Sequence, residues 1–126
     1  MDICVDFDGT CVTHAYPEMG VDIGAAPVLK RLLEQGHNLI IFTMRSGKEL
    51  DDAVNWFREK VGEPYGINTN PTQLSWTTSP KALGHLYIDD AALGAPLKYD
   101  SSISPRKFID WAQVYRYLRF NEILRH

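Results

Sequence analysis

Residues 2–10 read Asp-Ile-Cys-Val-Asp-Phe-Asp-Gly-Thr, and this stretch decides the fold. The apolar residues Ile3 to Val5 predict a short buried strand, and the glycine and polar residues after them predict a turn. A helix is then expected over residues 25–35, followed by a near-continuous apolar strand over residues 38–43. Strands that alternate with helices need crossover connections, so we expect an α/β domain with a mostly parallel sheet flanked by helices.

The rest of the chain continues this alternation less regularly. The further elements expected are, in order, a helix over 47–61, a weakly supported strand over 65–69, a loop over 70–79, a helical turn near 80–83, a strand over 85–89, a loop over 90–103 and a C-terminal helix ending near 123. The first of these helices has the clearest pattern, because its apolar residues recur on one stripe at helical spacing. Ser104 followed by Pro105 predicts the start of the last helix.

The composition limits the classes of function. The chain has 126 residues, the size of one ordinary domain, so we expect a single domain over residues 1–126. The formal net charge is −3, which disfavours sequence-independent binding to nucleic-acid phosphates. No apolar run approaches the roughly 18 residues of a membrane helix, and the first residues lack the pattern of a signal peptide. Two cysteines are too few for a disulfide framework, so we expect a cytoplasmic protein.

Polar side chains stand at the ends of three expected strands: Asp6, Asp8, Thr43, Asp89 and Asp90. In a parallel sheet these ends meet at one edge, where ligands of such folds collect. Several carboxylates brought together repel one another and need a cation or shifted protonation states. Oxygen ligands of this kind suit Mg²⁺ with waters and a phosphate completing the site. Lys81 would offset part of the negative charge and hold a phosphate oxygen, and the Thr43 hydroxyl would donate to another.

These residues resemble the four motifs of the haloacid-dehalogenase-like superfamily, in the same order along the chain. The matching stretches are Asp6-Phe7-Asp8-Gly9-Thr10, Leu39-Ile40-Ile41-Phe42-Thr43, Lys81 and Leu86-Tyr87-Ile88-Asp89-Asp90. The resemblance implies a Rossmann-like three-layer sandwich with a mostly parallel sheet. It also implies a Mg²⁺-dependent phosphatase that cleaves a phosphomonoester. The dehalogenase branch is disfavoured, because cleavage of a carbon–chlorine bond needs neither a general acid at Asp8 nor a metal ion.

The resemblance assigns a role to each matching position. Asp6 would be the nucleophile that becomes an aspartyl phosphate, and Asp8 would be the general acid and then the general base. Thr43 and Lys81 would hold the transferring phosphoryl group. The metal ligands would be Asp6, the backbone carbonyl of Asp8, Asp89 and, as a further ligand, Asp90. The backbone of Gly9 and Thr10 would approach the phosphate closely, which suits a glycine.

The spacing of the motifs leaves no room for the cap domain that many superfamily members carry. The expected helices, strands and loops fill the segments between Asp8 and Thr43 and between Thr43 and Lys81. Capless members take large substrates into an open site or use a neighbouring subunit as a lid. Aromatic residues on two faces of the C-terminal helix therefore suggest a homo-oligomer. The alternative is that one face packs on the sheet and the other aromatic side chains are exposed.

Several assignments stay open at this point. Lys98 could take the phosphate-binding role in place of Lys81. Arg45 could bind a substrate carboxylate or phosphate, or form a surface salt bridge. The loop over residues 11–20, which the resemblance makes a flap over the site, offers substrate contacts, and three residues between positions 68 and 76 have a similar claim. These candidate contacts are His14, Tyr16, Glu18, Asn68, Asn70 and Trp76.

Nothing in the sequence names the substrate. A small phosphorylated sugar or nucleotide is favoured, and a phosphorylated nucleic-acid end or protein is the alternative for an open site. A second class of function is a non-catalytic phosphate-binding or scaffold protein on the same fold. The presence of every catalytic residue type disfavours that class.

Overall fold

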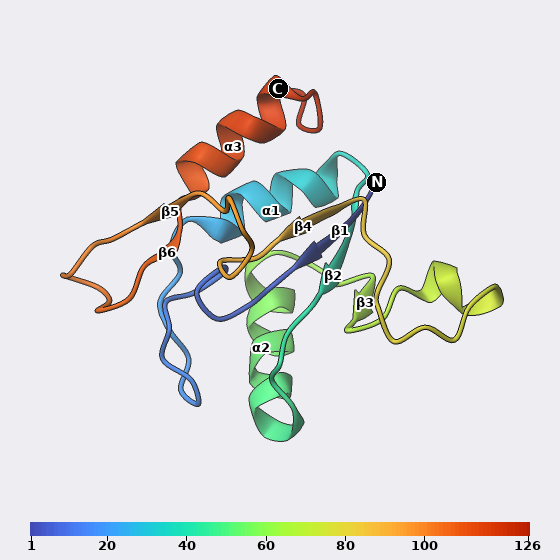
Figure 1. Ribbon diagram of the computed structural model, residues 1–126, viewed down its shortest axis with the longest axis horizontal. Coiled ribbons are helices and arrows are strands. Elements are labelled where there is room, and N and C mark those ends of the chain that lie inside the picture. Colours follow the sequence, from blue (N-terminus) through green and yellow to red (C-terminus); the bar gives the residue numbers. More distant parts are fainter.

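The computed structural model describes residues 1–126, and a four-stranded parallel sheet forms its centre (Figure 1). The strands are β1 (Asp2–Val5), β2 (Asn38–Ile41), β3 (Gly66–Ile67) and β4 (Leu86–Ile88), and they lie in the order β3-β2-β1-β4. Val5 at the end of β1 is in register with Ile41 of β2 and Ile88 of β4. The predicted parallel sheet is therefore confirmed, and the carboxyl ends of β1, β2 and β4 lie at the same edge.

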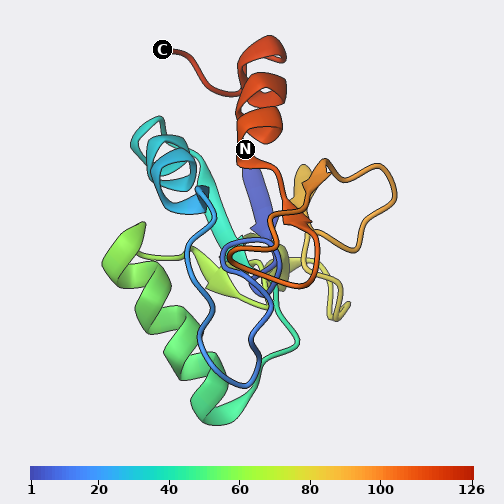
Figure 2. The same ribbon diagram turned by 90° about the vertical axis from the view of Figure 1, so that its left-hand side faces the viewer.

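Three α-helices supply one side of the core: α1 (Ala25–Glu34), α2 (Gly47–Lys60) and α3 (Trp111–Phe120). Their buried residues join a single cluster with Ile3 and Val5, the side chains on one face of β1. Figure 2 shows α1 and α2 on the same side of the strands. The apolar stripe predicted for residues 47–61 therefore faces the sheet, as do the buried residues of α1, in agreement with helical periodicity.

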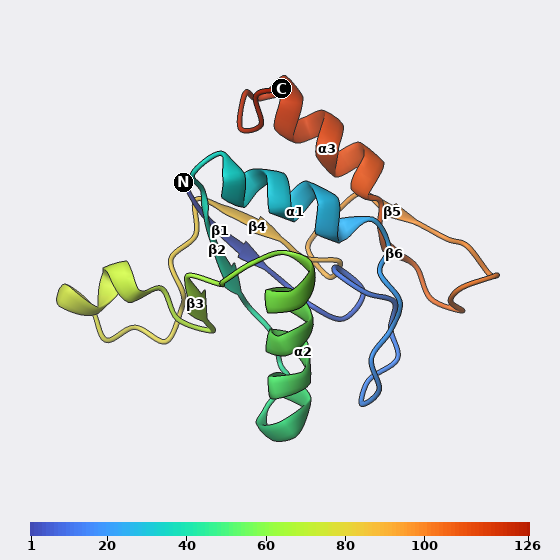
Figure 3. The same cartoon turned by 180° about the vertical axis from the view of Figure 1, so that it is seen from behind.

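The opposite face of the sheet has a thinner cover. Cys4 and Ile40 pack there against Ala82, within the segment that joins β3 to β4. This segment contains a short 3₁₀ helix, η1 (Pro71–Ser75), which extends away from the sheet on the side opposite β5 and β6 (Figure 3). The fold is thus a Rossmann-like three-layer α/β sandwich whose third layer is a loop with one turn of helix, and no cap domain is inserted in it.

The structure contradicts the prediction for residues 70–83. The helical turn lies at Pro71–Ser75, within the predicted loop, and residues 80–83 form no helix. Asn70 starts the turn because its side chain accepts a hydrogen bond from the Thr72 amide. The Gln73 side chain then satisfies the backbone of the later stretch, donating to the Lys81 carbonyl and accepting from the Leu83 amide. That stretch therefore needs no helical hydrogen bonds of its own.

The predicted start of the last helix is also wrong. Residues Leu97–Lys98 (β5) and Phe108–Ile109 (β6) form an antiparallel pair, which projects from the domain in Figure 1. Helix α3 begins only at Trp111, because the Asp110 carboxylate accepts hydrogen bonds from the amides of Ala112 and Gln113. The Ser104 hydroxyl instead accepts from the Arg106 amide in a local turn. Both serine and aspartate are strong capping residues, and the pairing of β6 with β5 excludes the earlier start.

Helix α3 is one-sided. Trp111, Val114 and Leu118 are buried, whereas the side chains of Tyr117 and Phe120 are 54% and 88% exposed. The exposed aromatic residues agree with either of the two alternatives for this helix, and the homo-oligomer stays a prediction. None of the helices has the length and apolar character that crossing a membrane requires.

Candidate functional site

Three aspartates meet at the carboxyl edge of the sheet. Asp6 follows β1 directly, and Asp89 and Asp90 follow β4, the parallel neighbour of β1. The Asp6 amide donates to the Ile88 carbonyl at 2.9 Å, which extends the strand pairing to the site itself. One carboxylate oxygen from each aspartate lies within 4.8 Å of the others. Strand pairing therefore brings together groups that are more than 80 positions apart in the chain.

The turn after Asp6 holds this cluster in place. The buried Thr10 hydroxyl donates to Asp6 Oδ2 at 2.8 Å and accepts from the Asp90 amide at 3.1 Å, so one side chain fixes both strand ends. The Thr10 carbonyl in turn accepts from the Trp111 indole at 2.6 Å, which anchors α3 to the site. Gly9 has a φ of +81°, and a Cβ there would overlap the His14 ring and the Asp90 carboxylate. Only glycine fits this turn without displacement.

The Asp6 carboxyl is strongly perturbed. Its pKa is raised to about 8, chiefly by burial and with further contributions from Asp89 and Asp90, against the opposing effect of the hydrogen bond from Thr10. Without a cation Asp6 therefore keeps a proton near neutral pH. Three converging carboxylate groups with oxygen ligands only are the donor set that Mg²⁺ prefers, so the chemistry of these residues fits the predicted metal.

Asp8 lies outside that cluster and pairs with Arg45 instead. The guanidinium donates from Nε to Asp8 Oδ2 and from Nη2 to Asp8 Oδ1, each at 2.8 Å. The hydrogen bonds that Arg45 donates to the Asp8 carboxylate raise the Arg45 pKa, and Arg45 is only 3% exposed. Both interpretations of Arg45 from the sequence assumed an accessible side chain, whereas the structure buries it in a bidentate ion pair. The Asp8 carboxylate does not join the metal cluster, and its predicted metal contact is the backbone carbonyl.

The flap over residues 11–20 closes against the site at two points. A hydrogen bond of 2.9 Å joins the Thr13 amide to the carbonyl of Val21, the residue that follows the flap. His14 Nε2 lies 2.9 Å from Asp90 Oδ2, and the Glu18 carbonyl accepts from Arg45 Nη2 at 2.8 Å. The flap therefore contacts Asp90 through His14, and Arg45 through the Glu18 backbone. This placement is consistent with a flap over the site.

Thr43 also lies at the carboxyl edge, two residues after β2. Its hydroxyl accepts from the Arg45 amide at 3.1 Å, and its own amide donates to the Asn68 side chain at 2.8 Å. Asn68 has a φ of +59°, a left-handed conformation that asparagine tolerates better than most residues. Asn68 thus holds the backbone of Thr43 in place. The sequence marked Asn68 only as a candidate substrate contact and gave no sign of this positioning role.

The two candidate lysines lie on different aromatic rings and touch none of the aspartates. Lys81 Nζ is 5.8 Å from the centre of the Tyr87 ring, and Lys98 Nζ is 5.9 Å from that of Phe108. Tyr87 pairs with Cys4, so Lys81 lies over the thinly covered face of the sheet, toward which the alternation of β1 also directs Asp6. Lys98 lies on the separate β5–β6 pair. The assignment of the phosphate-binding role to Lys81 rather than Lys98 stays a prediction.

Other residues singled out in the sequence have structural partners. Asn70 is fully buried and donates to Asp2 and to the Leu83 carbonyl, so it is a structural residue rather than a substrate contact. His85 is also structural, because its Nδ1 accepts a hydrogen bond from the Asp2 amide. Trp76 is 67% exposed and lines a cavity together with Lys81.

Comparison with known proteins gives one informative match. No family model and no curated protein matches the chain. A solved structure, that of a conserved protein coded by a locus of Bacteroides thetaiotaomicron, matches with a TM-score of 0.77 and 34% identity, over 96% of this chain and 91% of that chain. The chain belongs to the family of that conserved Bacteroides protein. Because the match covers nearly all of both chains, the two proteins share the whole fold described above and not only one motif.

Proposed function

We propose that this member of the family is a Mg²⁺-dependent phosphohydrolase that cleaves a phosphomonoester through an aspartyl phosphate on Asp6. The observation that carries the proposal is the meeting of Asp6, Asp89 and Asp90 within 4.8 Å at the ends of adjacent parallel strands. Such a cluster is costly in a folded protein unless a cation or a shared proton relieves it. The resemblance of all four motifs to the haloacid-dehalogenase-like superfamily supplies the reaction class.

Each residue has a defined part in the proposed reaction. In the first step an Asp6 oxygen attacks phosphorus and the bond to the leaving oxygen breaks. Asp8, which has to be protonated in the substrate complex to act as general acid, gives that oxygen its proton. In the second step water attacks the same phosphorus, Asp8 takes a proton from the water, and the bond to Asp6 breaks, which releases phosphate. The Thr43 hydroxyl and the Lys81 ammonium would hold the phosphoryl oxygens throughout.

The metal ligands in this proposal are Asp6, Asp89, Asp90 and the Asp8 backbone carbonyl. Bound Mg²⁺ would offset the negative charge of the cluster, keep Asp6 ionised for attack and polarise a phosphate oxygen. The substrate we favour is a small phosphorylated sugar or nucleotide. A nucleic-acid end remains the alternative, disfavoured by the net charge of −3.

The test is phosphate release from a panel of phosphomonoesters with and without Mg²⁺. The wild type should release phosphate only with the metal, and Asp6→Asn should abolish release while the protein stays folded by circular dichroism. Asp51→Asn is the matched control, because Asp51 is an exposed aspartate on α2 and should be dispensable. A wild type that binds phosphate esters without hydrolysing them would support the non-catalytic binding protein instead.

A further inference from the structure

We propose that Arg45 is a positioning residue that fixes the carboxylate of Asp8 and couples it to the flap. This inference rests on the proposed function, since it concerns the group assigned to proton transfer. Arg45 would act through Asp8 rather than by touching the substrate.

The contacts of Arg45 leave its guanidinium one position. Two parallel hydrogen bonds join it to the Asp8 oxygens, and Nη2 also reaches the Glu18 carbonyl at 2.8 Å. Nη1 donates to the Glu49 carbonyl at 3.2 Å. The centre of the group lies 5.2 Å from the Phe7 ring and 5.3 Å from the Tyr16 ring. A planar fork held at this many points sets both the direction and the plane of the carboxylate it binds.

The position of Arg45 in the chain links it to the remaining parts of the site. It follows Thr43 by two residues, and its amide donates to the Thr43 hydroxyl. Phe7 lies between Asp6 and Asp8. A buried ion pair is weak evidence of added stability, because desolvation offsets most of the attraction. The more informative property of this pair is therefore the single orientation that it imposes on Asp8.

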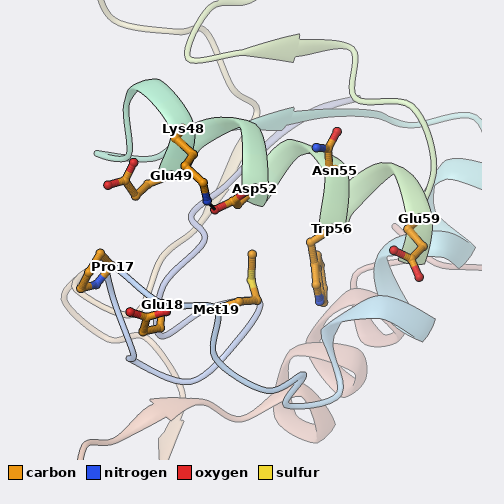
Figure 4. Close-up of a pocket in the computed structure, with 9 residues that line it drawn as sticks. All are labelled: Pro17, Glu18, Met19, Lys48, Glu49, Asp52, Asn55, Trp56 and Glu59. Carbon is orange, nitrogen blue, oxygen red and sulfur yellow. Dashed lines mark hydrogen bonds and ion pairs between the residues drawn. The ribbon is translucent and has the colours of Figure 1, made fainter.

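The flap and α2 form opposite walls of a cavity of about 560 Å³ (Figure 4). Pro17, Glu18 and Met19 of the flap face Asp52 and Trp56 of α2 across it.

Arg45 bonds a backbone carbonyl of each wall, at Glu18 and at Glu49. The guanidinium that orients Asp8 is thus the connection between flap and helix. A displacement of the flap would break a bond to Arg45 and change the support of Asp8, so the general acid and the flap are mechanically coupled.

This role predicts a dependence on the leaving group. An alkoxide leaves poorly without a proton, whereas 4-nitrophenolate leaves readily without one. General acid catalysis contributes about 10²- to 10⁴-fold. Loss of Asp8 orientation should therefore slow the first phosphoryl transfer from an alkyl phosphate far more than that from 4-nitrophenyl phosphate. A residue that merely binds the phosphate would affect both substrates alike.

The experiment is rapid-mixing kinetics of the first turnover with both substrates in saturating Mg²⁺. Arg45→Lys keeps the charge and loses the fork. We expect about a 100-fold loss of rate with the alkyl phosphate and a loss of less than about 5-fold with 4-nitrophenyl phosphate, at nearly unchanged KM. In an Asp8→Asn background Arg45→Lys should cause no additional loss, because both changes remove the same function.

Two further variants separate this role from general damage. Tyr16→Ala removes the 61% exposed ring stacked on the guanidinium and leaves the core intact. It should cause a smaller loss of first-turnover rate with the same leaving-group dependence. This variant keeps the test valid if Arg45→Lys fails to fold. Lys48→Met, at an exposed position of the same cavity, should change neither rate.

The other outcomes are equally defined. Equal losses with both substrates, a raised KM at constant first-turnover rate, or losses that add to those of Asp8→Asn would overturn the role of Arg45 while leaving the phosphatase intact. A wild type inactive on every phosphomonoester would overturn the proposed function, and the role of Arg45 with it.

Discussion

Binding of Mg²⁺ to this protein should depend steeply on pH, and Asp6 sets the dependence. Burial and the neighbouring Asp89 and Asp90 raise the Asp6 pKa to about 8 in the absence of a cation. A carboxylate must lose its proton to ligate a metal, so binding and deprotonation are linked. The affinity should therefore rise with pH up to about 8 and become constant above it.

The magnitude follows from the pKa. At pH 7 a group with a pKa of about 8 is roughly nine-tenths protonated, so binding should release about 0.9 proton. Between pH 6 and pH 8 the apparent affinity for Mg²⁺ should rise about 50-fold. Folding raises the Asp6 pKa from 3.8 to about 8, so between these pH values the unfolded chain releases the proton and the folded protein keeps it. The metal-free protein should therefore lose stability as the pH rises through this range. Mg²⁺ should consequently raise the melting temperature more at pH 8.5 than at pH 6.

Isothermal titration calorimetry measures both quantities, if Mg²⁺ is titrated at pH 7 in two buffers of different ionisation enthalpy. The difference in apparent enthalpy reports the protons released. Asp51→Asn should behave as wild type, and Asp6→Asn should bind more weakly with no proton release and little dependence on pH. Equal affinities at pH 6 and pH 8, or binding without proton release in the wild type, would refute the reasoning.

Other perturbations test how the fold is built. Asp110→Ala should cost about 1 kcal/mol of stability through loss of the α3 cap, measured by chemical denaturation; an unchanged midpoint would contradict the capping role. Gly9→Ala should destabilise by about 2 kcal/mol or more and displace His14, visible as a lower melting temperature and altered imidazole resonances. Burial raises the Cys4 pKa to about 11 and that of Cys11 well above its usual value, so iodoacetamide should modify neither in the native protein at pH 8 and both in urea, as read by intact mass.

The sheet and its first two helices could be predicted because local pattern and global fold agree there. Apolar runs mark β1 and β2, and a single apolar stripe marks α2, so periodicity alone was sufficient. The order of the motifs then placed Asp6 and Asp89 at the same edge, since parallel neighbours end together. That placement needed no knowledge of side-chain contacts.

The failures have a common cause in long-range contacts. The Gln73 side chain satisfies the backbone of residues 81–83, and no local pattern predicts such a partner. Ser104 and Asp110 could each cap the start of the last helix. Because β6 pairs with β5, the helix can begin only after β6, and Asp110 is the cap. Within the site, the pairing of Arg45 with Asp8 depends on how the loops after β1 and β2 pack together. The sequence offered only the presence of an arginine two residues after Thr43.

The account depends most on a phosphoryl group carried by Asp6. The direct measurement is to quench the wild type with acid during turnover of a phosphomonoester in Mg²⁺, and to locate the modification by peptide mass spectrometry. Borohydride reduction of an aspartyl phosphate converts the residue to homoserine and marks its position. The account predicts this conversion at Asp6, only with substrate and Mg²⁺ present. Turnover without any modified aspartate, or with the label at Asp8, would contradict it.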